Sequence, residues 1–117
     1  MEFYRHSTGA PVRLDILTGT GTPGASGRLL VAIDGHHGHL AVAGLSPLPP
    51  HRVYQLWFIR PAVTGGSFAV DVHGRAWASI TVPVSLDDMR EIEITAELSP
   101  GTAAPTGQPL LAAKTWR

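Results

Sequence analysis

Short runs in which apolar and polar residues alternate recur along the whole chain. A period of two is typical of a β-strand with one face in a core and the other in water. The runs are Val12–Ile16, Leu29–Ile33, Leu40–Val42, Phe68–Val72, Ala76–Val82 and Ile92–Leu98. Glycines and prolines separate them and leave room for one short helical turn, at Ser85–Met89. A last apolar run, Pro109–Ala113, is expected to close a sheet edge.

This spacing of short strands and turn residues predicts an all-β fold. We expect an antiparallel β-sandwich of immunoglobulin-like type with about seven to eight short strands. No internal repeat or linker divides the chain, so residues 1–117 are expected to form a single domain. His73-Gly74, between two of the runs, is expected to be a tight hairpin turn. The side chains predicted to be largely buried are Leu56, Trp57, Phe58, Val70, Ile80, Ile92 and Ile94.

One stretch, VYQLWFIR at Val53–Arg60, departs from the alternation. Both of its faces are mostly apolar, which is typical of a strand covered on two sides. Gln55 lies between Val53 and Trp57, so its amide is expected to be shielded from water and to need hydrogen-bond partners. We interpret Gln55 as a structural tie to a neighbouring loop, and a role in ligand binding is the alternative.

Charge and composition exclude several classes of function. Nine basic and nine acidic residues cancel, which argues against a nucleic-acid partner and gives no polybasic patch for anionic lipid. The absence of cysteine excludes disulfides, thiol nucleophiles and thiolate metal sites. No run reaches the 18 apolar residues of a membrane span, and the N-terminus has no signal-peptide core.

The segment DGHHGH holds Asp34, His36, His37 and His39, which are residue types that bind zinc, nickel or copper. All four fall within six residues of an expected hairpin tip, where side chains splay into water instead of converging. We interpret the segment as a solvated turn and expect no metal site. The alternative is a small binding module for a metal ion or glycan that uses His36, His37 and His39, or Trp77.

The evidence for catalytic residues is equally weak. Ser67 follows Gly65-Gly66, but the strand, turn and helix of a nucleophile elbow are not expected around it. Glu91, Glu93 and Glu97 fall on the polar face of their strand, and we interpret them as solvated acids. We therefore predict that the protein is not an enzyme and has no cofactor. Trp77 falls on the polar face of its own strand, where it either marks a contact surface or covers a loop of the same domain.

Several motifs occur in an order that resembles a known family. They are GLSPLPPHRVYQLWFIR, then GGSFAVDVHGRA, then ITAELSPGTAAPTGQPLL. Together they are similar to the C-terminal domain of anti-sigma-K-type anti-sigma factors, over about residues 28–113. The family-signature positions are Tyr54, Gln55, Leu56, Trp57, Gly66, Phe68, Gly74, Thr95, Glu97, Pro105, Thr106 and Gly107. The chain departs from the family pattern at Leu98, where proline is usual, and at Pro100-Gly101-Thr102, where Gly-Gly-Ser is usual.

The resemblance implies a regulatory role outside the cytoplasm. In that family the domain is tethered to the outer side of the bacterial cell membrane by one transmembrane helix, and a cytoplasmic domain binds the sigma factor. This chain contains neither, so it would meet the membrane and the sigma factor only through missing segments. The implied partners are a site protease or a second copy, and the implied mechanism is sigma-factor release by regulated proteolysis. On this view Gln55 secures the proline-rich crossover, Ser46–Pro50, or the Pro105–Gly107 loop.

Overall fold

The computed structural model describes residues 2–5, 11–32, 36–59, 62–83 and 90–114, with side chains described from residue 17 to residue 113 within these ranges. Nine strands are present in this part of the chain, and no helix. They are β1 (Glu2–Arg5), β2 (Pro11–Gly19), β3 (Ser26–Ala32), β4 (His37–Ala43), β5 (Arg52–Ile59), β6 (Val63–Phe68), β7 (Ala76–Thr81), β8 (Glu91–Leu98) and β9 (Leu111–Lys114). The predicted helical turn at Ser85–Met89 lies outside the described residues.

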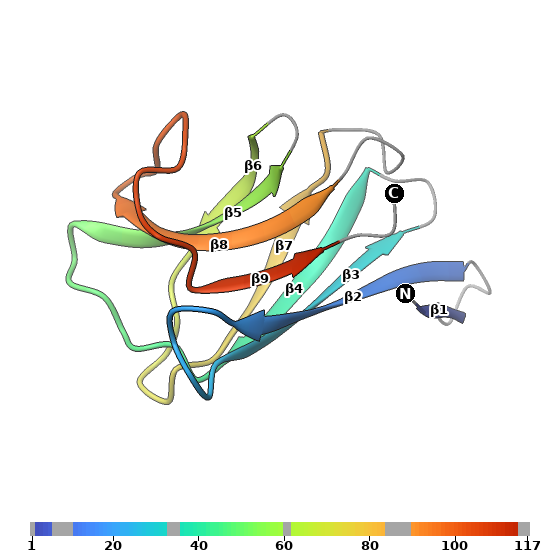
Figure 1. The fold of residues 1–117 in the computed structure, drawn as a ribbon, viewed down its shortest axis with the longest axis horizontal. Helices are drawn as coiled ribbons and strands as arrows, with labels where there is room; N and C mark the ends of the chain where they lie inside the picture. The colour runs from blue at the N-terminus through green and yellow to red at the C-terminus, as the bar shows by residue number, and fades with distance from the viewer. Residues whose placement is uncertain (1, 6–10, 33–35, 60–61, 84–89, 115–117) are drawn as a thin grey trace.

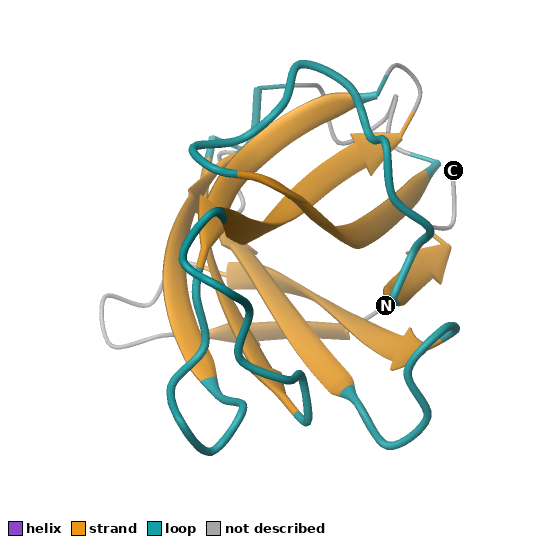
Figure 2. Cartoon of the chain, turned by 90° about the vertical axis from the view of Figure 1, so that its left-hand side faces the viewer, coloured by secondary structure: helices purple, strands orange, loops and turns teal. Residues whose placement is uncertain are grey.

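All nine strands belong to one antiparallel sheet in the order β6-β5-β8-β9-β2-β3-β4-β7, with β1 paired to β2. The sheet curves over on itself, so that β6-β5-β8 and β2-β3-β4-β7 form two facing layers (Figures 1 and 2). The two ends of the sheet come close together. This is shown by Gly65 in β6, where an added Cβ would lie 3.1 Å from the carbonyl oxygen of Thr81 in β7. The prediction of an all-β, sandwich-like fold is confirmed.

Strand β9 joins the two layers. It pairs with β8 on one side and with β2 on the other, where Thr18 lies opposite Ala112 and Gly19 opposite Leu111. The expectation that Pro109–Ala113 closes a sheet edge is therefore wrong, because this short strand is central. Its pairing with two strands far away in the sequence could not be read from the local pattern.

Apolar side chains from both layers meet in one core. Of the seven side chains predicted to be largely buried, Leu56, Phe58, Ile80, Ile92 and Ile94 are in this core and Val70 is half-buried against it. Trp57 is also buried, but on the outer face of β5. Burying each large side chain of this kind stabilises the fold by about 1.5–3 kcal/mol. The fully buried apolar residues are Leu17, Leu29, Val31, Leu56, Trp57, Phe58, Ile92, Ile94 and Leu111.

The turn at His73-Gly74 is present but does not join a hairpin. Asp71 closes it by accepting the backbone N–H of His73 at 2.8 Å and of Arg75 at 3.0 Å on its side-chain oxygen. The strands on either side, β6 and β7, lie at opposite ends of the strand order and pair with β5 and β4. The hairpin prediction is therefore wrong. Strand β6 ends at Phe68, which leaves Val72 84% exposed instead of in line with Phe68.

Candidate functional site

Buried polar side chains gather on the outer face of β5 and β8. The strand register places Gln55 opposite Thr95 and Val53 opposite Glu97, on the face away from the core. Gln55 is nevertheless only 3% exposed, and Thr95 and Glu97 are 0% exposed. The cover comes from residues 99–110, a loop between β8 and β9 that lies over this face. Hereafter we call this segment the β8–β9 loop.

Gln55 holds the first half of the β8–β9 loop. Its amide nitrogen donates to the carbonyl of Thr102 at 2.9 Å, and its amide oxygen accepts the backbone N–H of Thr102 at 3.0 Å. The second amide hydrogen goes to the hydroxyl oxygen of Thr64 at 3.0 Å. Both donors and the acceptor are thus satisfied, as a buried amide requires.

A β-bulge brings Thr64 within reach of Gln55. The register between β5 and β6 shifts at this point, with Leu56 opposite Gly66 but Trp57 opposite Thr64. Gly66 adopts a φ of 131° and donates its N–H to the Thr64 hydroxyl at 3.1 Å. A bulge re-aims the side chains next to it. Gly66, one of the signature positions, therefore shapes the site through its backbone.

Trp57, Thr95 and Glu97 form a chain of hydrogen bonds beside Gln55. The indole N–H of Trp57 donates to the hydroxyl oxygen of Thr95 at 2.8 Å, and the Thr95 hydroxyl donates to Glu97 Oε2. Each of these three side chains is 0% exposed. The chain runs along the outer face, from Trp57 on β5 to a carboxylate near the end of β8.

Glu97 holds the second half of the β8–β9 loop. Besides the Thr95 hydroxyl, its carboxylate accepts the hydroxyl of Thr106, the backbone N–H of Thr106 at 3.0 Å and that of Gly107 at 3.3 Å. Gly107 packs so closely that a Cβ there would lie 2.9 Å from the carbonyl oxygen of Ala96. Pro105, also a signature position, is half-buried in the same turn.

This arrangement fixes the charge of Glu97. Burial alone raises the pKa of a carboxyl group, but the hydroxyls of Thr106 and Thr95 and the N–H groups of Thr106 and Gly107 stabilise the ionised form. These hydrogen bonds prevail and hold the pKa of Glu97 at about 2. The group is therefore a buried anion bound by the protein's own loop.

Two expectations from the sequence need correction here. Glu97 was interpreted as a solvated acid, but it is fully buried, because alternation identifies the outer face and not the loop that covers it. Gln55 was expected to tie Ser46–Pro50 or Pro105–Gly107. The loop containing the latter is indeed contacted, but the partner of Gln55 is Thr102, and Thr106 and Gly107 are bound by Glu97 instead.

The proline-rich crossover is held by another signature residue, Tyr54. Its hydroxyl donates to the carbonyl of Ser46, and its ring stacks on Phe68 with centroids 5.7 Å apart. Burial raises the pKa of the Tyr54 hydroxyl above its ordinary value. Gly74, with a φ of 78°, accepts the N–H of Leu45 on its carbonyl at 3.3 Å. The crossover is thereby fixed from two sides.

Sequence reasoning missed Thr64 and Thr102. Both are small polar residues in regions rich in glycine, where neither alternation nor spacing marks a partner. Only the pairing of β5 with β6 and the fold-back of the β8–β9 loop bring them to Gln55. The departure Pro100-Gly101-Thr102 from the family pattern falls in the segment that Gln55 binds.

The histidine segment differs from its expected form. The strands on either side of the segment, β3 and β4, do pair as the expected hairpin, but His37 and His39 belong to β4 and not to its tip, while Asp34 lies outside the described residues. The ring of His39 stacks on Trp77 with centroids 5.3 Å apart and planes inclined by 15°. Trp77 is 65% exposed, so it lies on an outer face as expected, and its role as a contact surface stays a prediction.

No group of three or more histidine, aspartate or glutamate side chains that could hold a metal ion occurs among the residues described above. Nor does this part of the chain contain a helix long and apolar enough to cross a membrane.

The fold and these contacts define a class: an all-β domain whose buried polar side chains are engaged in holding two irregular segments of the same chain. The family described as "Anti-sigma-K factor rskA, C-terminal" matches residues 3–110. The chain therefore belongs to this family of anti-sigma factor C-terminal domains. No curated protein and no solved structure matches it significantly.

Proposed function

We propose that this domain is the extracytoplasmic regulatory part of a membrane-bound anti-sigma factor and that its folded state controls when the parent protein is cleaved. Membership of the family supports the regulatory role. In this proposal the domain does not bind the sigma factor and catalyses no reaction. The sigma factor is released when regulated proteolysis destroys the parent protein.

The observation that carries the proposal is the pair of clamps on the β8–β9 loop. Gln55 and Glu97 hold twelve residues of irregular backbone, 99–110, against the outer face of β5 and β8. A protease cuts extended backbone that has come away from the fold, so cleavage depends on local opening. Polar clamps of this kind contribute to the free energy of that opening, together with the packing of Leu110 against the core.

The test compares Glu97→Gln with Glu91→Gln in the full-length parent protein in cells that carry a sigma-dependent reporter. Both changes remove one carboxylate from β8, but only Glu97 holds the loop. We expect Glu97→Gln to raise reporter output and to produce a cleaved form on an immunoblot. Glu91→Gln should give no more output than the parent, because it removes a charge beside Glu93 and no contact with the loop. Uncleaved protein and unchanged output, in a Glu97→Gln domain shown to be destabilised when purified, would refute the role.

A further inference from the structure

The outer face of the other layer carries an aromatic side chain that the core and the β8–β9 loop do not use. Trp77 is on β7, opposite Ala41 on β4, and Ala41 is opposite Arg28 on β3. Residues opposite one another across neighbouring strands lie on the same face. A tryptophan left 65% exposed forgoes the stabilisation that burial would give, and such positions mark contact sites.

His39 fixes how Trp77 is presented. The imidazole lies nearly parallel to the indole, with centroids 5.3 Å apart, and it occupies one face of the indole ring. Trp77 nevertheless remains 65% exposed, so much of the indole is open to solvent. A ring supported in this way loses little rotational freedom when a ligand stacks on it, which lowers the entropic cost of binding.

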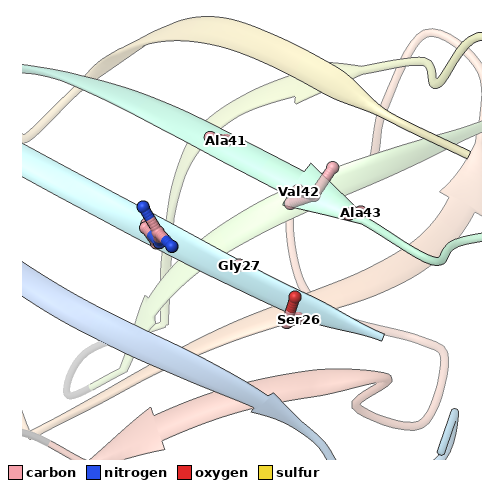
Figure 3. Close-up of a pocket in the computed structure, with 6 residues that line it drawn as sticks. Ser26, Gly27, Ala41, Val42 and Ala43 are labelled. Carbon is pink, nitrogen blue, oxygen red and sulfur yellow. The ribbon is translucent and has the colours of Figure 1, made fainter. Parts of the chain in front are cut away.

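A hollow lies over β3 and β4, next to the strand that carries Trp77. A pocket of about 400 Å³ is lined by Ser26, Gly27, Arg28, Ala41, Val42 and Ala43. Figure 3 shows Ser26 and Gly27 on β3 alongside Ala41–Ala43 on β4. Because these residues are small, a ligand can lie close to the two strands. The hollow is open to solvent, so a ligand would lie on it as on a shallow platform.

These features favour one class of ligand. A protein partner needs several large anchors over about 800 Å² of surface, whereas Trp77 is the one large apolar side chain that is mostly exposed on the described part of this face. A single-stranded nucleic acid also stacks on aromatic rings but needs a row of cations, and the described residues of this face include one arginine, Arg28, and no lysine. A sugar needs one flat apolar surface and a few polar groups.

We propose that the outer face of β3, β4 and β7 binds an acidic saccharide. The indole of Trp77 stacks against the C–H groups of a pyranose ring, and the guanidinium of Arg28 pairs with a carboxylate of the ligand. Arg28 and Trp77 are two strands apart, about 10 Å, which a disaccharide can bridge. A guanidinium pairs with a planar carboxylate through two parallel hydrogen bonds. This site is separate from the loop clamps, so it stands or falls independently of the proposed regulation.

The carboxylate can belong to the ring of a uronic acid or to the lactyl ether of a muramic acid. The purified chain is therefore titrated with a hyaluronan tetrasaccharide, with N-acetylmuramic acid and, as the neutral reference, with cellotetraose. Binding is followed by the shifts of the Trp77 indole N–H and of the Arg28 and Ala41 amides in nitrogen-15 spectra. We expect saturable shifts with at least one acidic sugar, with a Kd of about 1 mM or tighter, and weaker binding of cellotetraose.

Variants separate the two contacts. Trp77→Ala is expected to weaken acidic-sugar binding about 3- to 10-fold, and Arg28→Gln about 10-fold. Arg90→Gln, which removes an exposed arginine just before β8 in the other layer, is the matched control and should bind as the parent does. The proposal is wrong if about 10 mM of each sugar leaves the Trp77 indole signal unmoved. It is equally wrong if Trp77→Ala and Arg28→Gln bind like the parent, or if these signals shift with protein concentration alone, which would indicate self-association.

Discussion

Gln55 and Thr102 are 47 positions apart in the chain and exchange two hydrogen bonds, of 2.9 Å and 3.0 Å, between a side-chain amide and a backbone peptide group. The amide of Gln55 thus takes the place of a neighbouring strand for one residue of the β8–β9 loop. Gly101 makes this approach possible, because its φ of 139° is a backbone conformation that favours glycine.

Replacing Gln55 with leucine should destabilise the domain. The volume is similar, but the peptide group of Thr102 loses both partners in a site shielded from water, which costs about 1–3 kcal/mol. The melting temperature should fall by roughly 3–10 °C, measured by circular dichroism. Thr102→Ala is the control, since it keeps the backbone groups that Gln55 binds and should lower melting by less. A Gln55→Leu variant that melts at or above the parent temperature contradicts the structural role.

Gly74 offers a test of the crossover that Tyr54 also holds. Gly74→Ala must place a Cβ 2.5 Å from the carbonyl oxygen of Leu45, on a backbone with a φ of 78°. Gly24→Ala is a matched control, because Gly24 has a φ of 89° but open space around its Cβ position. We expect about 1–2 kcal/mol of destabilisation for Gly24→Ala from the backbone alone, and clearly more for Gly74→Ala. Chemical denaturation measures both variants. Equal losses of stability would show that Leu45 moves away from the added Cβ at no cost.

The sequence predicted the strands far better than what covers them. Alternation placed Ile92 and Ile94 in the core correctly, because it reports which face of a strand a side chain is on. It could not report that residues 99–110 fold back over the opposite face and bury Glu97. That cover depends on contacts between a loop and strands far away in the sequence.

The surface of the other layer illustrates the same limit. Trp77 was placed correctly on an outer face, yet its stacking on His39 depends on the pairing of β4 with β7, which are separated by two other strands in the sequence. Among the signature residues, Gln55 was the one whose burial and need for partners followed from its apolar neighbours. Its true partners, Thr64 and Thr102, required the β-bulge and the loop.

Glu97 predicts how stability depends on pH at the acid end. In the folded state its pKa is about 2, below the ordinary value of 4.5, so the unfolded chain binds more protons between these values. The stabilisation is complete above about pH 4.5 and is lost as the pH falls towards 2. Glu97→Gln should therefore be less stable at pH 7 by about 1–3 kcal/mol, since its amide hydrogens also face the N–H groups of Thr106 and Gly107. Denaturation curves at several pH values should show that the difference in stability between the parent and Glu97→Gln shrinks on acidification. A constant difference would contradict the bound anion.

The raised pKa of Glu93 predicts the opposite dependence of stability on pH, between about pH 4.5 and 7. Partial burial, together with the hydrogen bond and the charge of Glu91, raises the pKa of Glu93 from 4.5 to about 7. The folded state then binds more protons than the unfolded chain between these values, so stability falls as the pH rises from about 4.5 to 7. Glu93→Gln removes this loss and should raise the melting temperature by about 1–4 °C at pH 8, a small effect because solvent screens a half-buried group. At pH 4 the parent carboxyl is already protonated, so the two proteins should melt at the same temperature there.

Asp71→Asn changes an exposed carboxyl outside this pair and serves as a control that should not reproduce this pH dependence. A Glu93→Gln variant that melts below the parent at pH 8 would show that the ionised Glu93–Glu91 pair is tolerated, and that the pH of maximum stability is not set on β8.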